Sequence, residues 1–194
     1  MKKIVAILWH NSANRMRVLR EEVEKIADVR IFSAGSLGDG EEDINDLYAA
    51  IDQADLLLLN ETASDPIWKE INEYIKNSTL PMVYVGGEAA THVKNAQQAK
   101  WTAFANAYYT YGGAENTLNM LRFLCAEVLG EDISYGEVQR IPWDAIFAPD
   151  GTLYDSPESY FADYPRSEKG TIALVISRSA WVSDDMQVEN CLVQ

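Results

Sequence analysis

Residues 3–9, KIVAILW, form an unbroken apolar run near the start of the chain. A strand that is buried on both faces of a parallel sheet shows this continuous pattern, whereas a strand with one solvated face alternates between apolar and polar residues. Residues 55–59, DLLLL, repeat the pattern, and shorter runs stand at 29–33, VRIFS, and 81–87, PMVYVGG. These four runs predict four strands of one parallel sheet.

Helical signals separate the predicted strands. Asn11 or Ser12 can cap a helix after the first strand, and Asp43 can cap one ahead of the third. Ser64 can cap the next helix, with Pro66 in its first turn. Strands that alternate with helices of about ten to fifteen residues are typical of right-handed βαβ crossovers. The sequence therefore predicts the α/β class, as a doubly wound parallel sheet of about four strands in flavodoxin-like order.

Three further segments follow the sheet-forming part of the chain. Residues 88–130 are expected to be helical, most clearly over 115–129, ENTLNMLRFLCAEVL. The next segment is expected to be irregular, because residues 141–165 carry four of the chain's six prolines and six aromatic rings. A new buried-strand pattern at 170–177 and a helix signal from residue 184 then indicate the first βα unit of a second sheet.

Three domains are predicted from these segments. Residues 1–130 form a flavodoxin-like α/β N-terminal domain with C-terminal helices, residues 131–169 an irregular strap between domains, and residues 170–194 an incomplete second α/β domain. A lone strand and helix cannot bury both faces of the strand. We therefore expect residues 170–194 to pack against the parent domain or to pair with a neighbouring copy of the chain in a homo-oligomer.

The chain is acidic, with 30 Asp and Glu residues against 16 Lys and Arg residues and a net charge of −14. Residues 31–68 contain nine carboxylates and no Lys or Arg. Nucleic-acid binding depends on neutralising phosphates, so this charge predicts no nucleic-acid partner. No apolar run approaches the roughly 20 residues of a membrane span, so no membrane partner is expected. Cys125 and Cys191 lie far apart in the sequence, which fits a reducing, cytoplasmic location.

Several catalytic motifs are absent from the sequence. It contains no phosphate-binding P-loop, no GxSxG nucleophile elbow and no HExxH zinc motif. The acidic stretch at 34–43, AGSLGDGEED, is expected to be a solvated loop, since it lacks the central glycine and the closing glutamate of an EF-hand loop. The residues therefore predict no catalytic group, no metal ligand and no cofactor bound by the chain itself.

A ligand site is expected at the carboxyl ends of the strands, where open α/β sheets bind their ligands. The candidates that this rule brings together are His10, Asn11, Asn60, Glu61, Gly86, Gly87, Glu88 and His92. The loops of any doubly wound sheet gather at this edge, so these residues can equally be ordinary loop residues. Arg15, Arg17 and Arg20 offer positive charge on the first helix, although an exposed basic face that balances acidic neighbours is the simpler interpretation.

Four stretches in the second half of the chain carry recognisable motifs. YGGAENTLNMLRFL at 111–124 resembles a YGG-x-x-N-x-x-N-x-LRFL helix, and IPWDAIFAPDG at 141–151 resembles a P-x-x-G-I-[FY]-H-P-D segment. YFADYP at 160–165 resembles a short helix that ends in Tyr-Pro, and IALVISRSAWVSDDMQV at 172–188 is similar to a strand followed by R-S-x-W-x-x-x-[ND] and a helix. In this order they resemble the N-terminal region of the cobaltochelatase large subunit (CobN type) and the related magnesium chelatase H subunit.

The resemblance covers specific positions of the chain. The matching residues are Tyr111, Gly112, Gly113, Asn116, Arg122, Trp143, Phe147, Pro149, Asp150, Tyr164, Pro165, Arg178 and Trp181. The resemblance implies that they lie between domains, where the aromatic strap packs its rings at the junction. Two positions depart from the family: Ala145 stands where members have glycine, and Ala148 stands where they have histidine, so any role of that histidine is absent here.

The resemblance also implies a function. Family members insert cobalt into a corrinoid tetrapyrrole in cobalamin biosynthesis, or magnesium into protoporphyrin, with ATP hydrolysed by two smaller partner subunits. The implied partners are the remaining domains of the large subunit, two ATPase-type subunits and the tetrapyrrole, while ATP and a divalent metal belong to the full complex. Since the family's metal-handling residues lie downstream, the chain is expected to be structural or regulatory and inactive alone. The alternative is a free-standing flavodoxin-like module that binds a small molecule.

Overall fold

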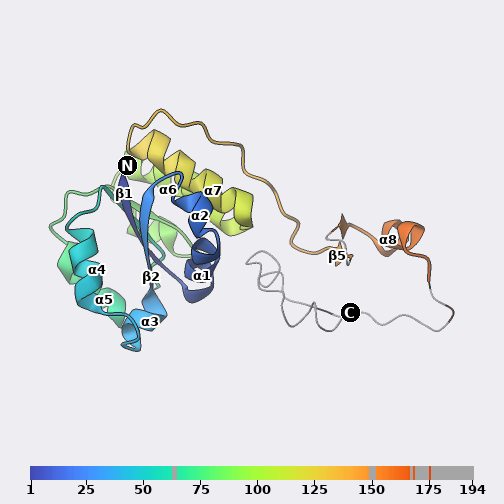
Figure 1. Ribbon diagram of the computed structural model, residues 1–194, viewed down its shortest axis with the longest axis horizontal. Coiled ribbons are helices and arrows are strands. Elements are labelled where there is room, and N and C mark those ends of the chain that lie inside the picture. The colour runs from blue at the N-terminus through green and yellow to red at the C-terminus, as the bar shows by residue number, and fades with distance from the viewer. Residues whose placement is uncertain (63–64, 149–151, 167, 169–174, 176–194) are drawn as a thin grey trace. The chain divides into compact units, whose positions relative to one another are not determined.

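A computed structural model describes residues 1–62, 65–148, 152–166, 168 and 175. Its centre is a four-stranded parallel sheet with the strand order β2-β1-β3-β4 (Figure 1). The strands are β1 (Lys3–Leu8), β2 (Asp28–Ser33), β3 (Leu56–Leu59) and β4 (Met82–Tyr84). A flavodoxin-like sheet has this order over its first four strands. The predicted fold class is therefore confirmed.

The apolar runs of the sequence form the inner strands of this sheet. β1 pairs on both sides, with Ile4 beside Val29 of β2 and beside Leu56 of β3. The four leucines of β3 have no exposed surface. This pattern arises because helices cover both faces of the sheet, so neither face of an inner strand needs polar side chains.

Helices cover the sheet in two layers. One face carries α1 (His10–Val18), α2 (Arg20–Val23), α6 (Ala96–Tyr111) and α7 (Ala114–Phe123), which continues into a π-helical turn, η2 (Leu124–Val128). The other face carries α3 (Ala34–Gly38), α4 (Ile44–Ile51) and α5 (Ile67–Ile75). A 3₁₀ turn, η1 (Ala89–His92), follows β4. Each layer encloses its own apolar core, with Met16 and Leu121 in the first and Leu47 and Ile71 in the second.

The start of α1 differs from the prediction. The helix begins at His10, and Trp9 alone links it to the end of β1 at Leu8. Asn11 and Ser12 therefore already lie inside the helix, and neither side chain caps it. The prediction that Asn11 or Ser12 caps this helix was wrong, because the strand and the helix follow one another almost without a loop.

The prediction that the acidic stretch at 34–43 is a loop was also partly wrong, because its first residues are helical. Residues Ala34–Gly38 form α3, and the Ser33 hydroxyl caps this helix by accepting a hydrogen bond from the Ser36 amide at 3.3 Å. Leu37 is buried in the second core, and such packing stabilises a short helix that its own residues do not favour. Asp43 caps α4 as predicted, accepting a hydrogen bond from the Asn45 amide.

The predicted helical stretch at 88–130 is interrupted in the middle. α6 ends at Tyr111 and α7 begins at Ala114, because Gly112 and Gly113 adopt positive φ angles of 69° and 82°. Residues other than glycine rarely adopt this backbone conformation, so the two glycines determine where the helix breaks. β4 is likewise shorter than the predicted run 81–87.

The structure divides into two compact units, Met1–Gln139 and Arg140–Gln194. The described part of the second unit contains an antiparallel pair, β5 (Ile146–Phe147) and β6 (Leu153–Tyr154), and a short helix, α8 (Pro157–Asp163). This segment is thus less irregular than predicted. The predicted cap Ser64, the motif residues Pro149, Asp150, Arg178 and Trp181, and the βα unit at 170–194 apart from Val175 lie outside the described residues. Within the described ranges, no helix is long and apolar enough to cross a membrane.

A pair of tyrosines, Tyr48 and Tyr74, joins α4 to α5. Tyr48 and Tyr74 stack with their ring centroids 3.9 Å apart, and the Tyr48 hydroxyl donates a hydrogen bond to Glu70 at 2.9 Å. Burial, followed by the hydrogen bond to Glu70, raises the pKa of Tyr48 to about 12. The unfolded chain has the ordinary tyrosine pKa of about 10.

The raised pKa predicts how the fold responds to pH. The stability that the neutral Tyr48 contributes is present below a pH of about 10 and is lost as the pH rises towards about 12, since the unfolded state releases its proton first. We expect the melting temperature of the wild type to fall more steeply across this window than that of Tyr48→Phe. Thermal denaturation followed by circular dichroism checks this, and equal slopes for the two proteins contradict it.

Candidate functional site

The carboxyl edge of the sheet brings together two of the predicted residues, Asn60, which follows β3, and Gly86, which lies shortly after β4. The Asn60 side chain donates a hydrogen bond to the Val85 carbonyl oxygen at 2.9 Å, and Asn60 is buried. Gly86 has a φ of 96°, and a Cβ atom at this position would come within 2.1 Å of the Asn60 Nδ2 atom. The Gly86 amide in turn donates to Asn106 Oδ1 at 2.7 Å. The Asn60 side chain therefore fills the space in which a Cβ atom of residue 86 would lie, and only glycine fits at this position.

A second pair at this edge, Glu61 and His92, forms a carboxylate–imidazole dyad. The His92 Nδ1 atom lies 3.2 Å from Glu61 Oε2, and the side chains are 21% and 10% exposed. Glu61 also accepts a hydrogen bond from the Asn72 side chain at 2.7 Å. The His92 ring stacks on Tyr84 with the ring centroids 5.0 Å apart. The carboxylate and the tyrosine thus fix the orientation of the imidazole.

The other nitrogen of this imidazole is what makes the dyad a candidate site. His92 Nε2 is buried and has no hydrogen-bond partner in the described part of the chain. When a carboxylate accepts a hydrogen bond from Nδ1–H of a neutral ring, Nε2 is left as an acceptor. Such a nitrogen can take up a proton, accept a hydrogen bond or bind a metal ion. The described residues hold no group of three His, Cys, Asp or Glu side chains that could complete a metal site.

The dyad predicts a specific tautomer of His92. The neutral His92 ring is expected to carry its proton on Nδ1, because from there it donates a hydrogen bond to Glu61 Oε2. We expect Glu61→Ala to shift the proton towards Nε2, a change that the imidazole ¹⁵N chemical shifts report directly. His10 is an internal control, since its ring bonds to the Asn14 side chain rather than to a carboxylate. An unchanged His92 pattern in Glu61→Ala contradicts the assignment.

The remaining candidates of the carboxyl edge do not join this dyad. His10 is exposed at the start of α1, and its Nε2 atom lies 3.0 Å from Asn14 Nδ2. Asn11, Gly87 and Glu88 are also exposed. The two histidines therefore have different surroundings, and the predicted convergence of all eight residues is only partial.

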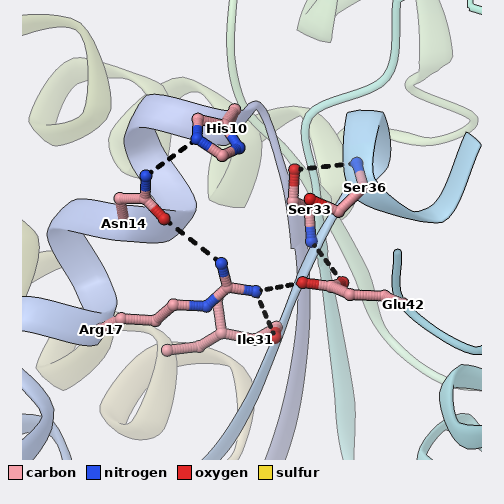
Figure 2. A network of polar contacts seen from close by, with 7 residues as sticks. All are labelled: His10, Asn14, Arg17, Ile31, Ser33, Ser36 and Glu42. Carbon is pink, nitrogen blue, oxygen red and sulfur yellow. Dashed lines mark hydrogen bonds and ion pairs between the residues drawn. The ribbon is translucent and has the colours of Figure 1, made fainter. Parts of the chain in front are cut away.

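His10 belongs instead to a chain of polar contacts that ties α1 to β2 (Figure 2). Asn14 accepts a hydrogen bond from Arg17, and Arg17 forms an ion pair with Glu42 and also donates to the Ile31 carbonyl oxygen. The Glu42 carboxylate closes the network by accepting the Ser33 amide at 2.9 Å. These contacts hold the segment after β2 against the first helix.

The arginines of α1 and α2 are engaged within the fold. Arg15 is only 9% exposed and reaches the Ser12 hydroxyl at 3.4 Å. Arg20 pairs with Glu24 at 2.6 Å, and this hydrogen bond raises the pKa of the guanidinium. The Arg17 and Arg20 pairs agree with the interpretation of basic residues that balance acidic neighbours, whereas Arg15 is buried and is not part of an exposed basic face.

The residues of the YGG motif form a different kind of site, at the start of α7. Gly112 and Gly113 make the break between α6 and α7. Asn116, which is 1% exposed, donates from Nδ2 to the Gly112 carbonyl oxygen and to the Gln139 carbonyl oxygen, both at 2.8 Å. Its Oδ1 atom accepts the Gln139 amide at 2.8 Å. One buried side chain therefore bonds both backbone groups of Gln139, as a neighbouring strand would.

Asn119, one helical turn further on, repeats this contact with the same segment. Its Oδ1 atom accepts the Gly136 amide at 3.1 Å and an Arg122 hydrogen bond at 2.9 Å. The Tyr108 hydroxyl of α6 donates to the Gly136 carbonyl oxygen at 2.5 Å. A Cβ atom on Gly136 would lie 3.0 Å from Asn119 Nδ2. We call Asn116 and Asn119 the asparagine clamp.

Apolar contacts support the segment that the asparagine clamp holds. Ile133 and Val138 pack against the first core. The Tyr135 ring meets the buried Phe123 ring edge-on, with the centroids 5.4 Å apart. Residues 133–139, which contain no regular helix or strand, are therefore fixed on α6 and α7 by side chains. The geometry of the motif holds a segment of backbone in place.

Three tyrosines of the second unit, Tyr154, Tyr160 and the motif residue Tyr164, pack on one another. Tyr164 stacks on Tyr160 at 5.1 Å, and Tyr154 meets Tyr160 edge-on at 5.5 Å. Phe147 lies in β5, Pro165 is exposed after α8, and Trp143 is 65% exposed. The packing of these rings at a domain junction remains a prediction.

Sequence reasoning missed several residues of both sites. Asn72, Tyr84 and Asn106 surround the dyad and Gly86, but they stand within helices or a strand and carry no motif. Asn119 could have been found from the sequence, because its spacing of three residues from Asn116 places both amides on one face of a helix.

Comparisons with known proteins agree with the resemblance seen in the sequence. Residues 106–194 match the family described as CobN/Magnesium Chelatase, a range that includes all of α7. "Uncharacterized protein MJ1441" of Methanocaldococcus jannaschii is 27% identical over 192 residues, which cover 96% of this chain and 14% of that protein. The catalytic subunit of cobaltochelatase from Mycobacterium tuberculosis has the same fold, with a TM-score of 0.59 at 18% identity over 98% of this chain and 15% of that one. The chain thus spans a small part of the length of both relatives.

Proposed function

Because residues 106–194 match the CobN/Magnesium Chelatase family, we propose that this chain supplies the N-terminal part of a metallochelatase large subunit. In this function the complete subunit inserts cobalt into a corrinoid, or magnesium into a porphyrin, with ATP hydrolysed by two partner subunits. The chain contributes structure or regulation and is inactive alone. It works together with the remaining domains of the large subunit, which handle the metal and the tetrapyrrole.

The observation that carries this proposal is the role of the family motif in the structure. Asn116 and Asn119 direct their amides to the backbone of Gln139 and Gly136, and Arg122 bonds to Asn119. A motif that binds a substrate would direct polar groups towards an open cavity. A motif that instead fixes the segment ahead of the second unit supports a structural role in a multidomain protein.

Cobalt insertion reconstituted from separate polypeptides tests the proposal. The mixture contains the two ATPase subunits, a large subunit lacking the region that this chain represents, ATP, Co²⁺ and a corrinoid whose absorbance reports insertion. Adding this chain is expected to restore insertion, whereas the chain alone shows none. Asn116→Ala is expected to restore less than the exposed control Asn45→Ala. A folded wild-type chain that restores nothing contradicts the proposal.

A small-molecule binding module is the second candidate, and the buried, unpartnered His92 Nε2 in the described part of the chain favours it. We expect the ligand of such a module not to be a flavin nucleotide, because Trp9 alone links β1 to α1 and no phosphate-wrapping loop stands between them. Titration of the chain with FMN is therefore expected to leave the flavin fluorescence unchanged, and tight binding of FMN contradicts this.

A further inference from the structure

A hollow lies at the amino edge of the sheet, opposite the edge with the dyad. α4 and α5 both end here, ahead of β3 and β4 in the chain. Its volume is about 420 Å³, within the range of ordinary ligand pockets. It is lined by Ile51, Asp52, Ala54, Tyr74, Ile75, Asn77, Ser78, Thr79 and Leu80, and we call it the α4–α5 hollow.

The charge in the α4–α5 hollow is negative. Among the described residues that line it, Asp52 is the one that carries a charge. The carboxylate accepts a hydrogen bond from the Tyr74 hydroxyl at 2.8 Å through Oδ1, and Oδ2 has no hydrogen-bond partner in the described ranges. Two helices also end in the lining, and the carboxyl end of a helix carries partial negative charge. The hollow therefore favours a cation.

Part of the lining of the α4–α5 hollow is apolar. Ile51 and Ile75 are each 4% exposed, so they present a closed surface from the second core. Tyr74 also belongs to the lining, and the stacking of its ring on Tyr48, with the centroids 3.9 Å apart, holds it in position. A cation with an apolar stem matches this combination better than a bare inorganic ion does.

The chain's own lysines near this edge already have partners. Lys3 Nζ donates to the Gln53 side chain at 3.1 Å, and Lys76 pairs with Glu73. The surrounding sequence from residue 31 to residue 68 contains no Lys or Arg. These contacts leave neither lysine as an obvious partner for Asp52, and the acidic surface attracts basic partners.

We propose that the α4–α5 hollow binds an arginine side chain presented by a basic partner protein. The forked guanidinium donates to Asp52 Oδ2 and to the carbonyl groups at the helix ends, and its planar face packs on the Tyr74 ring. The aliphatic part of the arginine covers Ile51 and Ile75. Lysine fits less well, because its compact ammonium is strongly hydrated and lacks the planar fork. This inference goes beyond the chelatase function and does not depend on it.

Titration of the ¹⁵N-labelled full chain with N-acetyl-L-arginine amide, followed by NMR, tests the proposal. Chemical-shift changes are expected at Asp52, Ser78 and Thr79, saturating in the millimolar range for this small probe. The uncharged citrulline analogue is expected to produce no saturable change. Asp52→Asn is expected to weaken arginine binding about fivefold, as for a solvent-accessible ion pair.

Asp46→Asn is the matched control, since Asp46 is an exposed carboxylate in the first turn of the same helix and outside the hollow. It is expected to bind the arginine probe as the wild type does. Three results overturn the proposal: no saturable shift with the arginine probe, equal shifts with the citrulline analogue, or equal weakening by Asp46→Asn and Asp52→Asn. The citrulline comparison uses the wild-type chain, so it holds even where a variant is destabilised.

Discussion

Replacing Asn116 by alanine is expected to lower the free energy of unfolding of the chain by about 3 kcal/mol. The substitution removes three hydrogen bonds of a side chain that is 1% exposed. It also leaves the buried Gly112 carbonyl oxygen without this partner, and an unsatisfied buried polar group costs more than a hydrogen bond contributes, whereas the backbone of the exposed Gln139 can bond to water. Urea denaturation followed by far-ultraviolet circular dichroism measures the difference.

Asn45→Ala is the control for the asparagine substitution. Asn45 is exposed in the first turn of α4, where its side chain bonds only to Asp43 within the described residues. We expect a change below about 0.5 kcal/mol for this variant. Equal midpoints for Asn116→Ala and Asn45→Ala would mean that the asparagine clamp contributes nothing to the fold.

Replacing Gly86 by alanine is expected to lower the free energy of unfolding by at least about 3 kcal/mol, or to prevent folding. Two effects add at this position. A φ of 96° is strained for any residue with a Cβ atom, and the new atom would lie 2.1 Å from Asn60 Nδ2. Asn60 cannot turn away without losing its hydrogen bond to Val85 inside the protein. The same urea denaturation experiment measures this effect.

The neighbouring glycine is a matched control. Gly87 has open space where a Cβ atom would stand and no positive φ, so Gly87→Ala is expected to change the free energy of unfolding by less than about 0.5 kcal/mol. Comparable losses for Gly86→Ala and Gly87→Ala contradict the specific conflict with Asn60. The double variant Gly86→Ala with Asn60→Ala is expected to recover only part of the loss, because the strained φ remains.

The sheet could be predicted from the sequence because its inner strands are apolar throughout. The runs at 3–9 and 55–59 have no polar alternation, and this pattern indicates burial on both faces before any contact is known. α3 could not be predicted in the same way. Its residues, AGSLG, favour a turn, and the helix depends on the burial of Leu37 and on the Ser33 cap.

The two candidate sites differ in how much of each the sequence reveals. The rule for the carboxyl edge led to Glu61 and His92, because both follow the ends of strands. Their contact could not be predicted, since it depends on the conformation of η1 and on the stacking of His92 on Tyr84. The family motif indicated Asn116, but only the structure shows that its partner is Gln139, 23 residues further along the chain.

Hydrogen exchange at the amides of residues 136–139 tests most directly whether the family motif fixes this segment. In the full chain, the amides of Gly136 and Gln139 are expected to exchange slowly, as they donate to Asn119 and Asn116. The Glu137 amide between them has no such partner in the described part of the chain and is expected to exchange fast. Exchange of Gly136 and Gln139 at the same rate as Glu137 would show that the segment is not held on α7, and the structural role proposed for the motif would be wrong.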